Sequence, residues 1–487
     1  METAETALSS VDPVNKATDK GVRHFTRNGG RLCVCSEHTS TEDAKPLMET
    51  QLRNGMVLTA IGLCAGVMTP ETTLAQTAVG AVINGADTAW VLMSSALVLA
   101  MTVPGLALFY GGLVRSKNVL GTIMHSFAIL CVVSLFWVLL GYSLAFGPDV
   151  NGVIGSLAWV GLSGVGLSPH PVYGPTIPHQ AFMVFQLMFA AITPALITGA
   201  FAERMKFGAL ILFALLWSLL IYCPVAHWVW GGGWLAGLGA LDFAGGAVVH
   251  ISSGISALVC ALVLGARQGY GTDYMAPHNL PMVLLGTGLL WVGWFGFNAG
   301  SALGANETAV VAFVATHTAA VAAALSWMAV EWWHRGTPTV LGIASGAVAG
   351  LAMVTPGAGF VSPFSALFMG LVAGGLSYVA IMKKGGFGYD DSLDVVGIHG
   401  VAGIGGILLT GLLASKGVNA AGADGLLHGN AAFFAVQAVV VVVVGVFSAV
   451  GTWVILKAVD RLVGLRVLPE EERMGLDLSQ HNERAYS

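Results

Sequence analysis

Apolar, uncharged stretches long enough to cross a membrane follow one another from residue 88 to residue 460, and few polar linkers separate them. A hydrocarbon core about 30 Å thick requires a helix of about 20 apolar residues. Only 10% of the 487 residues are charged, so most side chains must face lipid or be buried. A β-barrel is excluded because barrel strands alternate apolar and polar residues. The pattern predicts an all-α polytopic membrane protein.

The basic residues indicate how many spans there are and how they are oriented. Eleven spans are expected, at residues 88–114, 119–146, 179–202, 207–229, 243–265, 279–300, 307–333, 338–356, 360–382, 395–414 and 430–459. Basic residues fall in alternate loops and after the last span, at Arg115, Lys117, Arg204, Lys206, Arg267, Arg335, Lys383, Lys384, Arg461 and Arg466. The intervening loops carry only Lys416. The positive-inside rule then predicts an N-terminus outside and a C-terminus inside.

An odd number of spans predicts an inverted repeat. The first five spans and the next five would form two halves of opposite orientation, with the eleventh helix added at the end. His250 lies in the fifth span and His399 in the tenth, which are equivalent elements of the two halves. The two imidazoles could therefore meet from opposite sides of the membrane.

Ionisable residues inside a membrane are costly, so they are functional candidates by default. Asp242 precedes His250 by eight residues, about 12 Å along a helix, which would bring His250 near the middle of the bilayer. The simpler interpretation of Asp242 is an N-cap. Among 13 histidines, His250 and His399 alone combine a deep expected position with symmetric placement. Other charged loop residues are expected to be solvated: Glu203, Arg204, Asp390, Asp391 and Asp394.

The N-terminal region differs in composition from the apolar middle of the chain. Its first part is polar and without periodicity, which is typical of disorder or of a non-native extension. A basic residue, a short apolar core and small residues then follow, as in a signal peptide, so Met48 or Met56 is expected to be the true start. The expected divisions are an extension (1–47), a signal peptide (48–75), a short extracytoplasmic segment (76–87), a transmembrane domain (88–462) and a cytoplasmic tail (463–487).

Several other classes of protein fit the sequence poorly. The six cysteines are scattered and make neither a disulfide framework nor a zinc pattern. No basic patch with interleaved aromatic residues suggests a nucleic-acid partner. A membrane metalloenzyme that uses the two histidines as ligands is an alternative, but a metal site needs three or four ligands and the sequence offers two.

Eight stretches match the motifs of a known family. They are P-G-L-A-L-F-Y-G-G-L-V-R-S-K-N (104–118), F-A-E-R (201–204), H-W-V-W-G-G-G (227–233), L-D-F-A-G-G-A-V-V-H (241–250), P-H-N-L-P (277–281), W-F-G-F-N-A-G-S (294–301), D-V-V-G-I-H-G (394–400) and G-L-R-V-L-P-E-E-E-R-M-G-L-D (464–477). In these stretches the chain resembles the ammonium transporter family (Amt/Mep/Rh), most closely its bacterial members. The resemblance covers about residues 88 to 487 in collinear order.

The resemblance implies an eleven-helix homotrimer with one pore in each subunit, and it assigns roles to eight residues. An outer ammonium site would comprise Phe185, Phe189, Trp230 and Ser301, with Asp242 nearby holding the structure and lowering the local potential. Phe189 and Phe297 would be the stacked rings that close the pore below this site. His250 and His399 would be the paired pore histidines. Aromatic faces attract cations, which suits the outer site, although belt or packing aromatics are the simpler interpretation.

The function implied by the resemblance is transport of ammonium, with methylammonium as an analogue, across the cell inner (plasma) membrane. No enzymatic activity and no cofactor are expected. A PII-type signal protein would be a partner at the cytoplasmic face. An ammonium sensor on the same fold is an alternative, although the tail after Leu462 is about 25 residues long and such sensors usually add a signalling domain. The sequence does not distinguish movement of ammonia, of ammonium, or of ammonia with a separately relayed proton.

Overall fold

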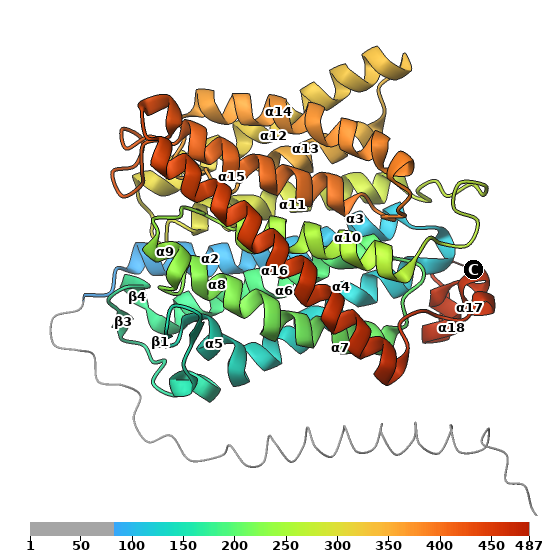
Figure 1. The fold of residues 1–487 in the computed structure, drawn as a ribbon, viewed down its shortest axis with the longest axis horizontal. Helices are drawn as coiled ribbons and strands as arrows, with labels where there is room; N and C mark the ends of the chain where they lie inside the picture. Colours follow the sequence, from blue (N-terminus) through green and yellow to red (C-terminus); the bar gives the residue numbers. More distant parts are fainter. Residues whose placement is uncertain (1–81, 487) are drawn as a thin grey trace, which may run out of the picture. The chain divides into compact units, whose positions relative to one another are not determined.

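The computed structural model describes residues 82–486, which form a bundle of helices (Figure 1). In this part of the chain ten helices are long and apolar enough to cross a membrane, and α13 (Val340–Val354) is a shorter apolar helix of 15 residues. These eleven helices coincide with the eleven predicted spans, so the predicted all-α polytopic fold is confirmed. The expected divisions at 1–47 and 48–75, and residues 76–81 of the next, lie outside the described residues.

The first five spans are mostly built from consecutive helical pieces. They are α2 (Gly85–Ala100), η1 (Met101–Leu106) and α3 (Ala107–Leu113); η2 (Ser116–Asn118), α4 (Val119–Phe136), η3 (Trp137–Gly141) and α5 (Tyr142–Phe146); α6 (His179–Phe201); α7 (Phe207–Trp217), η5 (Ser218–Tyr222) and α8 (Cys223–Val229); and η6 (Gly246–Ile251) with α10 (Ser252–Leu264). The loops between them carry β1 (Asp149–Val150), β2 (Ile154–Gly155), η4 (Leu157–Leu162), β3 (Pro169–His170), β4 (Gly174–Pro178) and α9 (Trp234–Gly237). Two antiparallel pairs result, β1 with β2 and β3 with β4.

The next five spans are mostly continuous, and the last helix crosses the others. They are α11 (Leu280–Gly300), α12 (Glu307–Arg335), α13, α14 (Pro363–Lys383) extended by η7 (Lys384–Phe387), and η8 (Val396–Val401) with α15 (Ala402–Leu413). After η9 (Leu426–His428), the 33-residue α16 (Ala431–Val463) runs obliquely across the bundle and packs against α10 and α15 (Figure 1). The short helices α17 (Pro469–Met474) and α18 (Leu476–His481) form the tail.

Polar residues placed just before the apolar runs determine where many helices begin. In six cases the side-chain oxygen of the preceding residue accepts a backbone N–H from the first turn, at Asn84, Asn279, Asn306, Thr339, Ser362 and Asn430. Such caps satisfy N–H groups that have no partner inside the helix. Caps therefore fix the boundaries that apolar periodicity leaves uncertain.

α13 is too short to cross a bilayer by itself, at about 22 Å for 15 residues. Most of its side chains are buried, and it packs against α12 and α14. A helix covered by protein can be shorter than the lipid is thick, because the N–H and C=O groups at its ends find partners in the protein or in water instead of facing lipid. The predicted span at 338–356 is thus confirmed as a helix and shortened at both ends.

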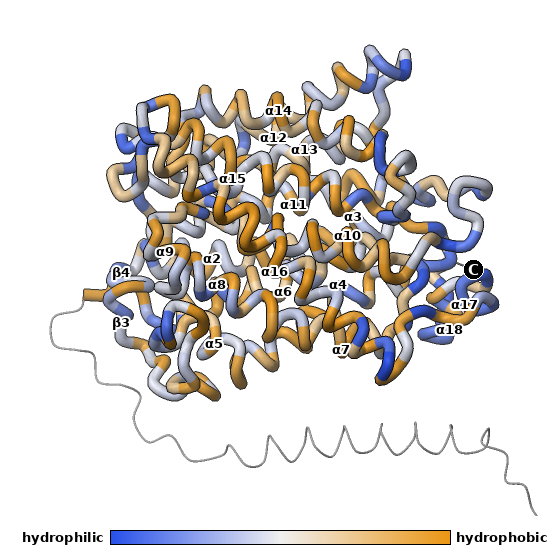
Figure 2. Tube along the Cα trace, viewed as in Figure 1, coloured by the Kyte–Doolittle hydropathy of each residue, from blue (hydrophilic) through white to orange (hydrophobic). Residues whose placement is uncertain are grey.

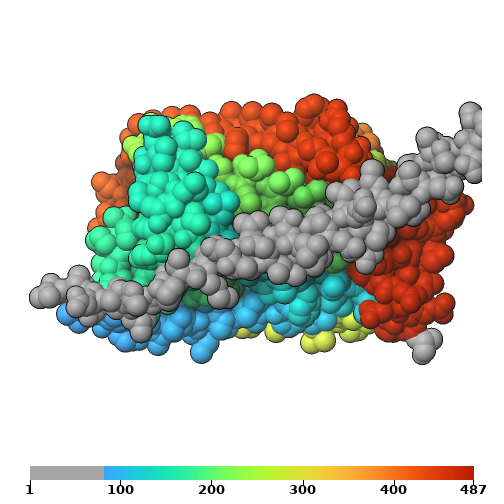
Figure 3. Space-filling model, turned by 90° about the horizontal axis from the view of Figure 1, so that it is seen from below, coloured from blue at the N-terminus to red at the C-terminus, as the bar shows by residue number. Residues whose placement is uncertain are grey.

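Hydrophilic residues gather at the two ends of the helices, and apolar residues cover the middle (Figure 2). The tail lies at one end, and the loops between α5 and α6 lie at the other (Figure 3). Basic loops contact the tail: Lys117 Nζ donates to the Glu472 carbonyl oxygen, and the Lys206 N–H donates to the Leu465 carbonyl oxygen. With the positive-inside rule, the end that carries the tail is the cytoplasmic end. We call it the inner end and the opposite one the outer end.

The fifth and tenth spans meet at the centre of the bundle and begin in the same way. Each opens with a π-helical turn that contains a histidine, His250 in η6 and His399 in η8. α10 packs against η8, and α15 packs against η6. At the closest approach Gly254 lies against Gly400, where a Cβ on Gly254 would overlap the Gly400 backbone. This close packing of small residues, common between membrane helices, brings the two halves together.

Candidate functional site

A cavity of about 270 Å³ opens near the outer end of the bundle. Its lining consists of Val172, Tyr173, Phe182, Gln186, Phe189, Val229, Trp230, Phe243, Ser301 and Leu303. Three of the residues assigned to the outer site or the gate by resemblance are thus brought together here, namely Phe189, Trp230 and Ser301. Phe185 does not line this cavity: it is fully buried and packs behind Phe189, with ring centroids 5.0 Å apart.

Hydrogen bonds fix Trp230 and Ser301 in orientations that suit a cation. Trp230 Nε1 donates to the Asp242 carbonyl oxygen at 2.8 Å, so the indole is held by its polar edge. Ser301 Oγ donates to the Phe297 carbonyl oxygen at 2.9 Å, which leaves its lone pairs free to accept. Ring faces and an accepting hydroxyl are the groups that can replace part of the hydration shell of a small cation.

Two phenylalanine rings pack against each other at the cavity, and one of them, Phe189, is part of its lining. Phe189 from α6 and Phe297 from α11 have ring centroids 4.3 Å apart, at an interplanar angle of 32°. Both side chains are almost completely buried. The ring of His250 packs against Phe297, at 6.1 Å between centroids, and neither of these two residues lines the cavity. The order cavity, phenyl pair, histidine therefore runs from the outer end toward the centre.

Asp242 is a capping residue rather than part of the cavity lining. Its carboxylate oxygens accept four backbone N–H groups at the start of η6, those of Gly245, Gly246, Ala247 and Val248, at 2.6–3.1 Å. The turn passes through Gly245, whose φ of +116° is a conformation that residues with a side chain rarely adopt. Asp242 therefore fixes η6 through its carboxylate and Trp230 through its backbone carbonyl.

The two histidines meet at the centre, as their symmetric positions predicted. Their Nδ1 atoms are 3.3 Å apart and their ring centroids 5.2 Å apart. His250 is completely buried and His399 is 4% exposed. At this distance one Nδ1 donates and the other accepts, so at least one ring lacks its Nδ1 proton. His250 Nε2 has no hydrogen-bond partner among the described residues. Trp294 and Phe297 cover the His250 ring.

The alternative of a metal site finds no third ligand nearby. Across residues 82–486, no group of three His, Cys, Asp or Glu side chains is arranged to hold a metal ion. The histidine pair provides two adjacent ring nitrogens that can share one proton, and the side chains of Trp294 and Phe297 cover the His250 ring with apolar surface.

Asp391 is a candidate residue that the sequence interpretation missed. It stands eight residues before His399, the same spacing as from Asp242 to His250. Its Oδ2 accepts the Val396 N–H at 2.7 Å, at the start of η8, while Oδ1 has no partner among the described residues. Burial raises the pKa of Asp391 to about 6, although the nearby Lys384 opposes the shift. The repeated eight-residue spacing was the signal that could have identified it.

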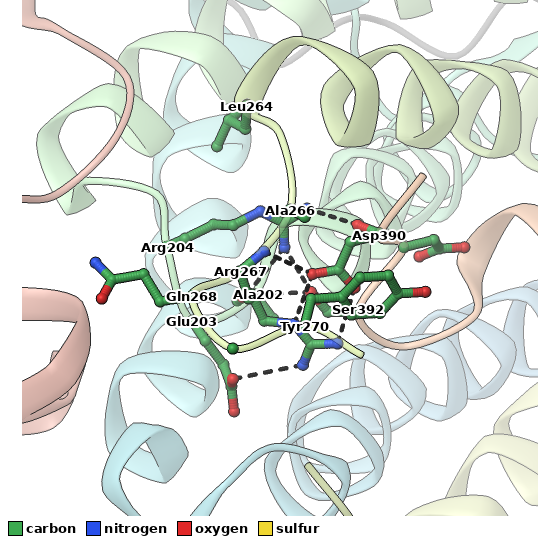
Figure 4. Close-up of polar contacts among 12 residues, drawn as sticks. Ala202, Glu203, Arg204, Leu264, Ala266, Arg267, Gln268, Tyr270, Asp390 and Ser392 are labelled. Atoms are coloured by element: carbon green, nitrogen blue, oxygen red, sulfur yellow. Dashed lines mark hydrogen bonds and ion pairs between the residues drawn. The ribbon is translucent and has the colours of Figure 1, made fainter. Parts of the chain in front are cut away.

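Four of the charged loop residues expected to be solvated are in fact buried at the inner end, namely Glu203, Arg204, Asp390 and Asp391. Three of them belong to a polar cluster that joins loops from separate spans (Figure 4). Arg267 donates to Asp390 through Nε at 2.8 Å and approaches Glu203 at 3.4 Å. Arg204 donates to Ser392 Oγ and to the Asp390 carbonyl oxygen, each at 2.6 Å. The expectation was wrong because the loops cover one another and pair their charges, which a single loop sequence does not show.

Charge pairing keeps this cluster ionised. Burial alone would raise the pKa of the Glu203 carboxyl, but Arg267 and Arg115 outweigh it, and the pKa lies below its ordinary value. The same holds for Asp390, whose pKa is lowered by Arg267 against the effect of burial. Removing one partner would leave a buried charge unpaired, which is strongly destabilising.

The tail reaches the same inner loops and also caps a membrane helix. Arg466 donates to the carbonyl oxygens of Leu264 and Ala266 at 2.9 and 2.7 Å. Glu472 Oε1 accepts the Gln268 N–H at 2.7 Å. Asp477 Oδ1 accepts the Gly121 N–H of α4 at 2.8 Å. The tail is thus bound to the start of the second span and to the end of the fifth span with the loop that follows it.

Comparison with known proteins identifies the chain's family. Residues 89–486 match the family model of the Ammonium Transporter Family. An ammonium transporter of Bacillus subtilis (strain 168) is 53% identical over 401 residues, which are 82% of this chain and 98% of that protein. The crystal structure of Candida albicans Mep2 is 36% identical with a TM-score of 0.76, covering 83% of this chain and 91% of that one. A solved structure named Sensor Amt Protein is 29% identical with a TM-score of 0.75, covering 81% and 98% respectively. The chain is therefore a multi-pass membrane protein of the Ammonium Transporter Family, and its relatives are named transporters rather than enzymes.

Proposed function

We propose that this chain transports ammonium by collecting the ion in the outer cavity and passing it as ammonia along the His250–His399 pair. The observation that carries the proposal is the 3.3 Å contact between the two Nδ1 atoms, directly below the ring pair Phe189–Phe297. The aromatic faces and Ser301 would stabilise the cation above the rings. The phenylalanines would then act as a gate and the histidines as a filter.

Selectivity against potassium follows from the chemistry of the path. Ammonium and potassium ions are similar in size and charge, so an electrostatic site separates them poorly. Ammonium can give up a proton and potassium cannot. A bare cation between phenyl rings would pay a large desolvation cost, whereas neutral ammonia pays little. The histidine pair offers ammonia one accepting and one donating nitrogen, and it can relay the proton that ammonium gives up, so that ammonia and one positive charge both cross.

Currents carried by purified protein in liposomes test the filter. Wild type, His250→Ala and His399→Ala are compared under ammonium and potassium gradients. Each variant is expected either to lose electrogenic ammonium transport or to conduct potassium, because the polar track is broken or the pore is widened. Thermal unfolding in detergent verifies that the variants are folded. If both variants carry ammonium current at the wild-type level and still exclude potassium, the assignment of the histidines as a filter is wrong.

An ammonium sensor on the same fold is the second candidate. The likeness to the structure named Sensor Amt Protein favours it, at 29% identity and a TM-score of 0.75. The same liposome currents separate the two functions, since a sensor that does not transport would carry no ammonium current.

We propose further that three copies assemble and that a PII-type signal protein blocks the inner mouth of the pore. Support for the assembly is the resemblance, together with the exposed apolar residues Val310, Phe313 and Val314 on α12. Of the basic inner-loop residues, Arg204 is buried and Lys384 pairs with Asp394, so support for an inner-face partner comes from Lys206 and the exposed Lys383. Native mass spectrometry tests the trimer, and a single-subunit mass would refute it. The block is tested by adding a PII protein to the liposome assay, and undiminished currents would refute it.

A further inference from the structure

The outer cavity contains a carboxamide to which the proposed function gives no role. Gln186 lies on α6 and lines the cavity together with Phe189, Trp230 and Ser301. Gln186 and Phe189 are three residues apart, so they project from the same face of the helix. Gln186 is 8% exposed, and more than nine-tenths of it is therefore buried.

The Gln186 oxygen is unpaired in these surroundings. Oε1 is buried and accepts no hydrogen bond from any residue within 82–486. A buried amide oxygen without a partner is costly, and in native proteins such a group calls for an explanation. The carboxamide lines a cavity of about 270 Å³, and rotation about its terminal torsion would turn the oxygen toward a guest there.

The other polar side chains of the cavity turn their hydrogens away from it. Trp230 Nε1 donates to the Asp242 carbonyl oxygen, Ser301 Oγ to that of Phe297, and Tyr173 Oη to that of Gly231. Ser301 and Tyr173 therefore offer only lone pairs to a guest, and the aromatic rings offer only their negative faces. The cavity is equipped to accept hydrogen bonds and to attract positive charge. It has no hydroxyl or indole donor available for the Gln186 oxygen.

We infer that Gln186 is a substrate-binding residue of the outer site, and that its carboxamide oxygen accepts an N–H from the bound ammonium ion. The terminal torsion of a glutamine is broad, so a cation in the cavity can select the oxygen over the amino group. Ammonium has four N–H donors, which Gln186 Oε1, Ser301 Oγ, Tyr173 Oη and the ring faces can receive. Methylammonium keeps three donors and can place its methyl group on the rings. The inference rests on the proposed function and adds to it a residue that sets affinity.

The test measures how transport saturates in liposomes containing the full-length protein. A hydrogen bond to a charged group contributes enough that its loss should raise the half-saturating ammonium concentration about tenfold in Gln186→Leu. The half-saturating concentration should move more than the maximal current. Gln186→Glu keeps a carbonyl acceptor whether or not it is protonated, so its half-saturating concentration should stay at or below that of wild type. Methylammonium should follow the same order of variants.

Trp230→Leu and Ser301→Ala, measured in parallel, distinguish failure of the inference from failure of the proposed site. If these two shift half-saturation while Gln186→Leu stays within twofold of wild type, the inference is overturned and the outer site stands. If none of the three shifts it, the outer site is wrong and the inference falls with it. If both Gln186 variants lower the maximal current and leave the half-saturating concentration unchanged, Gln186 has a structural role. That result would also overturn the inference.

Discussion

Asp242 and Asp391 occupy equivalent positions in the two halves, yet their surroundings differ. The Asp242 carboxylate accepts four backbone N–H groups, all of them at one helix start. The Asp391 carboxylate accepts the Val396 N–H and leaves Oδ1 without a partner among the described residues. Hydrogen bonds from several N–H groups favour the charged form of a carboxyl, and burial without them favours the neutral form. Burial raises the pKa of Asp391, at the inner end, to about 6, so this aspartate is expected to titrate near neutral pH.

Protonation of Asp391 should make the stability of the protein depend on pH. Its native pKa is about 6, above the ordinary aspartate pKa of 3.8, mainly because the carboxyl is buried. Between these values the native state holds a proton that the unfolded chain releases, so stability falls as pH rises from about 4 to about 6. The full effect is up to about 3 kcal/mol at about 1.4 kcal/mol per pKa unit. Asp391→Asn should remove it while keeping an acceptor for Val396.

Denaturation midpoints in detergent, taken at intervals from pH 4 to pH 7, check this prediction. Wild type should lose stability relative to Asp391→Asn over the lower part of this range and then run parallel to it. Asp273→Asn, at an exposed position of an inner loop, is the matched control and should leave the profile unchanged. Parallel profiles for wild type and Asp391→Asn at all pH values would contradict the assignment.

At the scale of the helices, the histidine contact depends on how closely the fifth and tenth spans approach. Gly254 lies against the backbone of Gly400, and Gly403 lies under His250, with 2.9 Å between a Cβ placed there and the His250 Cβ. No side chain separates the two spans at these positions. The 3.3 Å distance between the Nδ1 atoms is therefore set by backbone contact as well as by the histidines themselves.

Gly254→Ala should push the two spans apart and weaken the filter without touching either histidine. Carbon atoms in contact prefer about 3.5–4 Å, so the added methyl group cannot be accommodated without a shift of the helices. Overpacking of this kind costs about 1–3 kcal/mol of stability. The ammonium current should fall, or potassium should leak, together with a lower thermal midpoint.

Gly445→Ala on α16 is the matched control, because a Cβ there meets nothing within 4 Å. It should leave both current and thermal midpoint unchanged. A Gly254→Ala protein with wild-type current and selectivity would show that the helix approach does not set the histidine contact.

At the scale of the whole molecule, the features predicted from sequence are those that the bilayer imposes. Apolar length and alternate basic loops predicted eleven spans, because every crossing must satisfy the same thickness and charge rules. Symmetric placement predicted that His250 and His399 meet. Contacts between distant loops follow no local rule, so the burial of Glu203 and Asp390 could not be predicted. Nor could the sequence show that Gln186 lines the outer cavity while its neighbour Phe185 is buried against Phe189 and does not line it.

The tail contacts several inner loops at once, so its role involves the whole inner end of the molecule. Deleting residues 464–487 removes Arg466, Glu472 and Asp477, which bind the loop after α10 and the start of α4. α10 directly continues η6, which contains His250, and α4 packs against α6, which contains Phe189. Loss of these contacts should therefore loosen both the filter and the gate. Transport in liposomes is expected to fall several-fold, and thermal stability should fall with it.

Single substitutions in the tail test whether individual hydrogen bonds, rather than the presence of the tail as a whole, support transport. Asp477→Ala leaves the Gly121 N–H at the start of α4 without its acceptor, and loss of such a cap costs about 1 kcal/mol. This variant should reproduce part of the loss seen on deletion. Glu483→Gln, at an exposed position further along the tail, is the control and should behave as wild type. Full transport by the protein lacking residues 464–487 would exclude a coupling role for the tail, because the filter and gate would then keep their geometry without it.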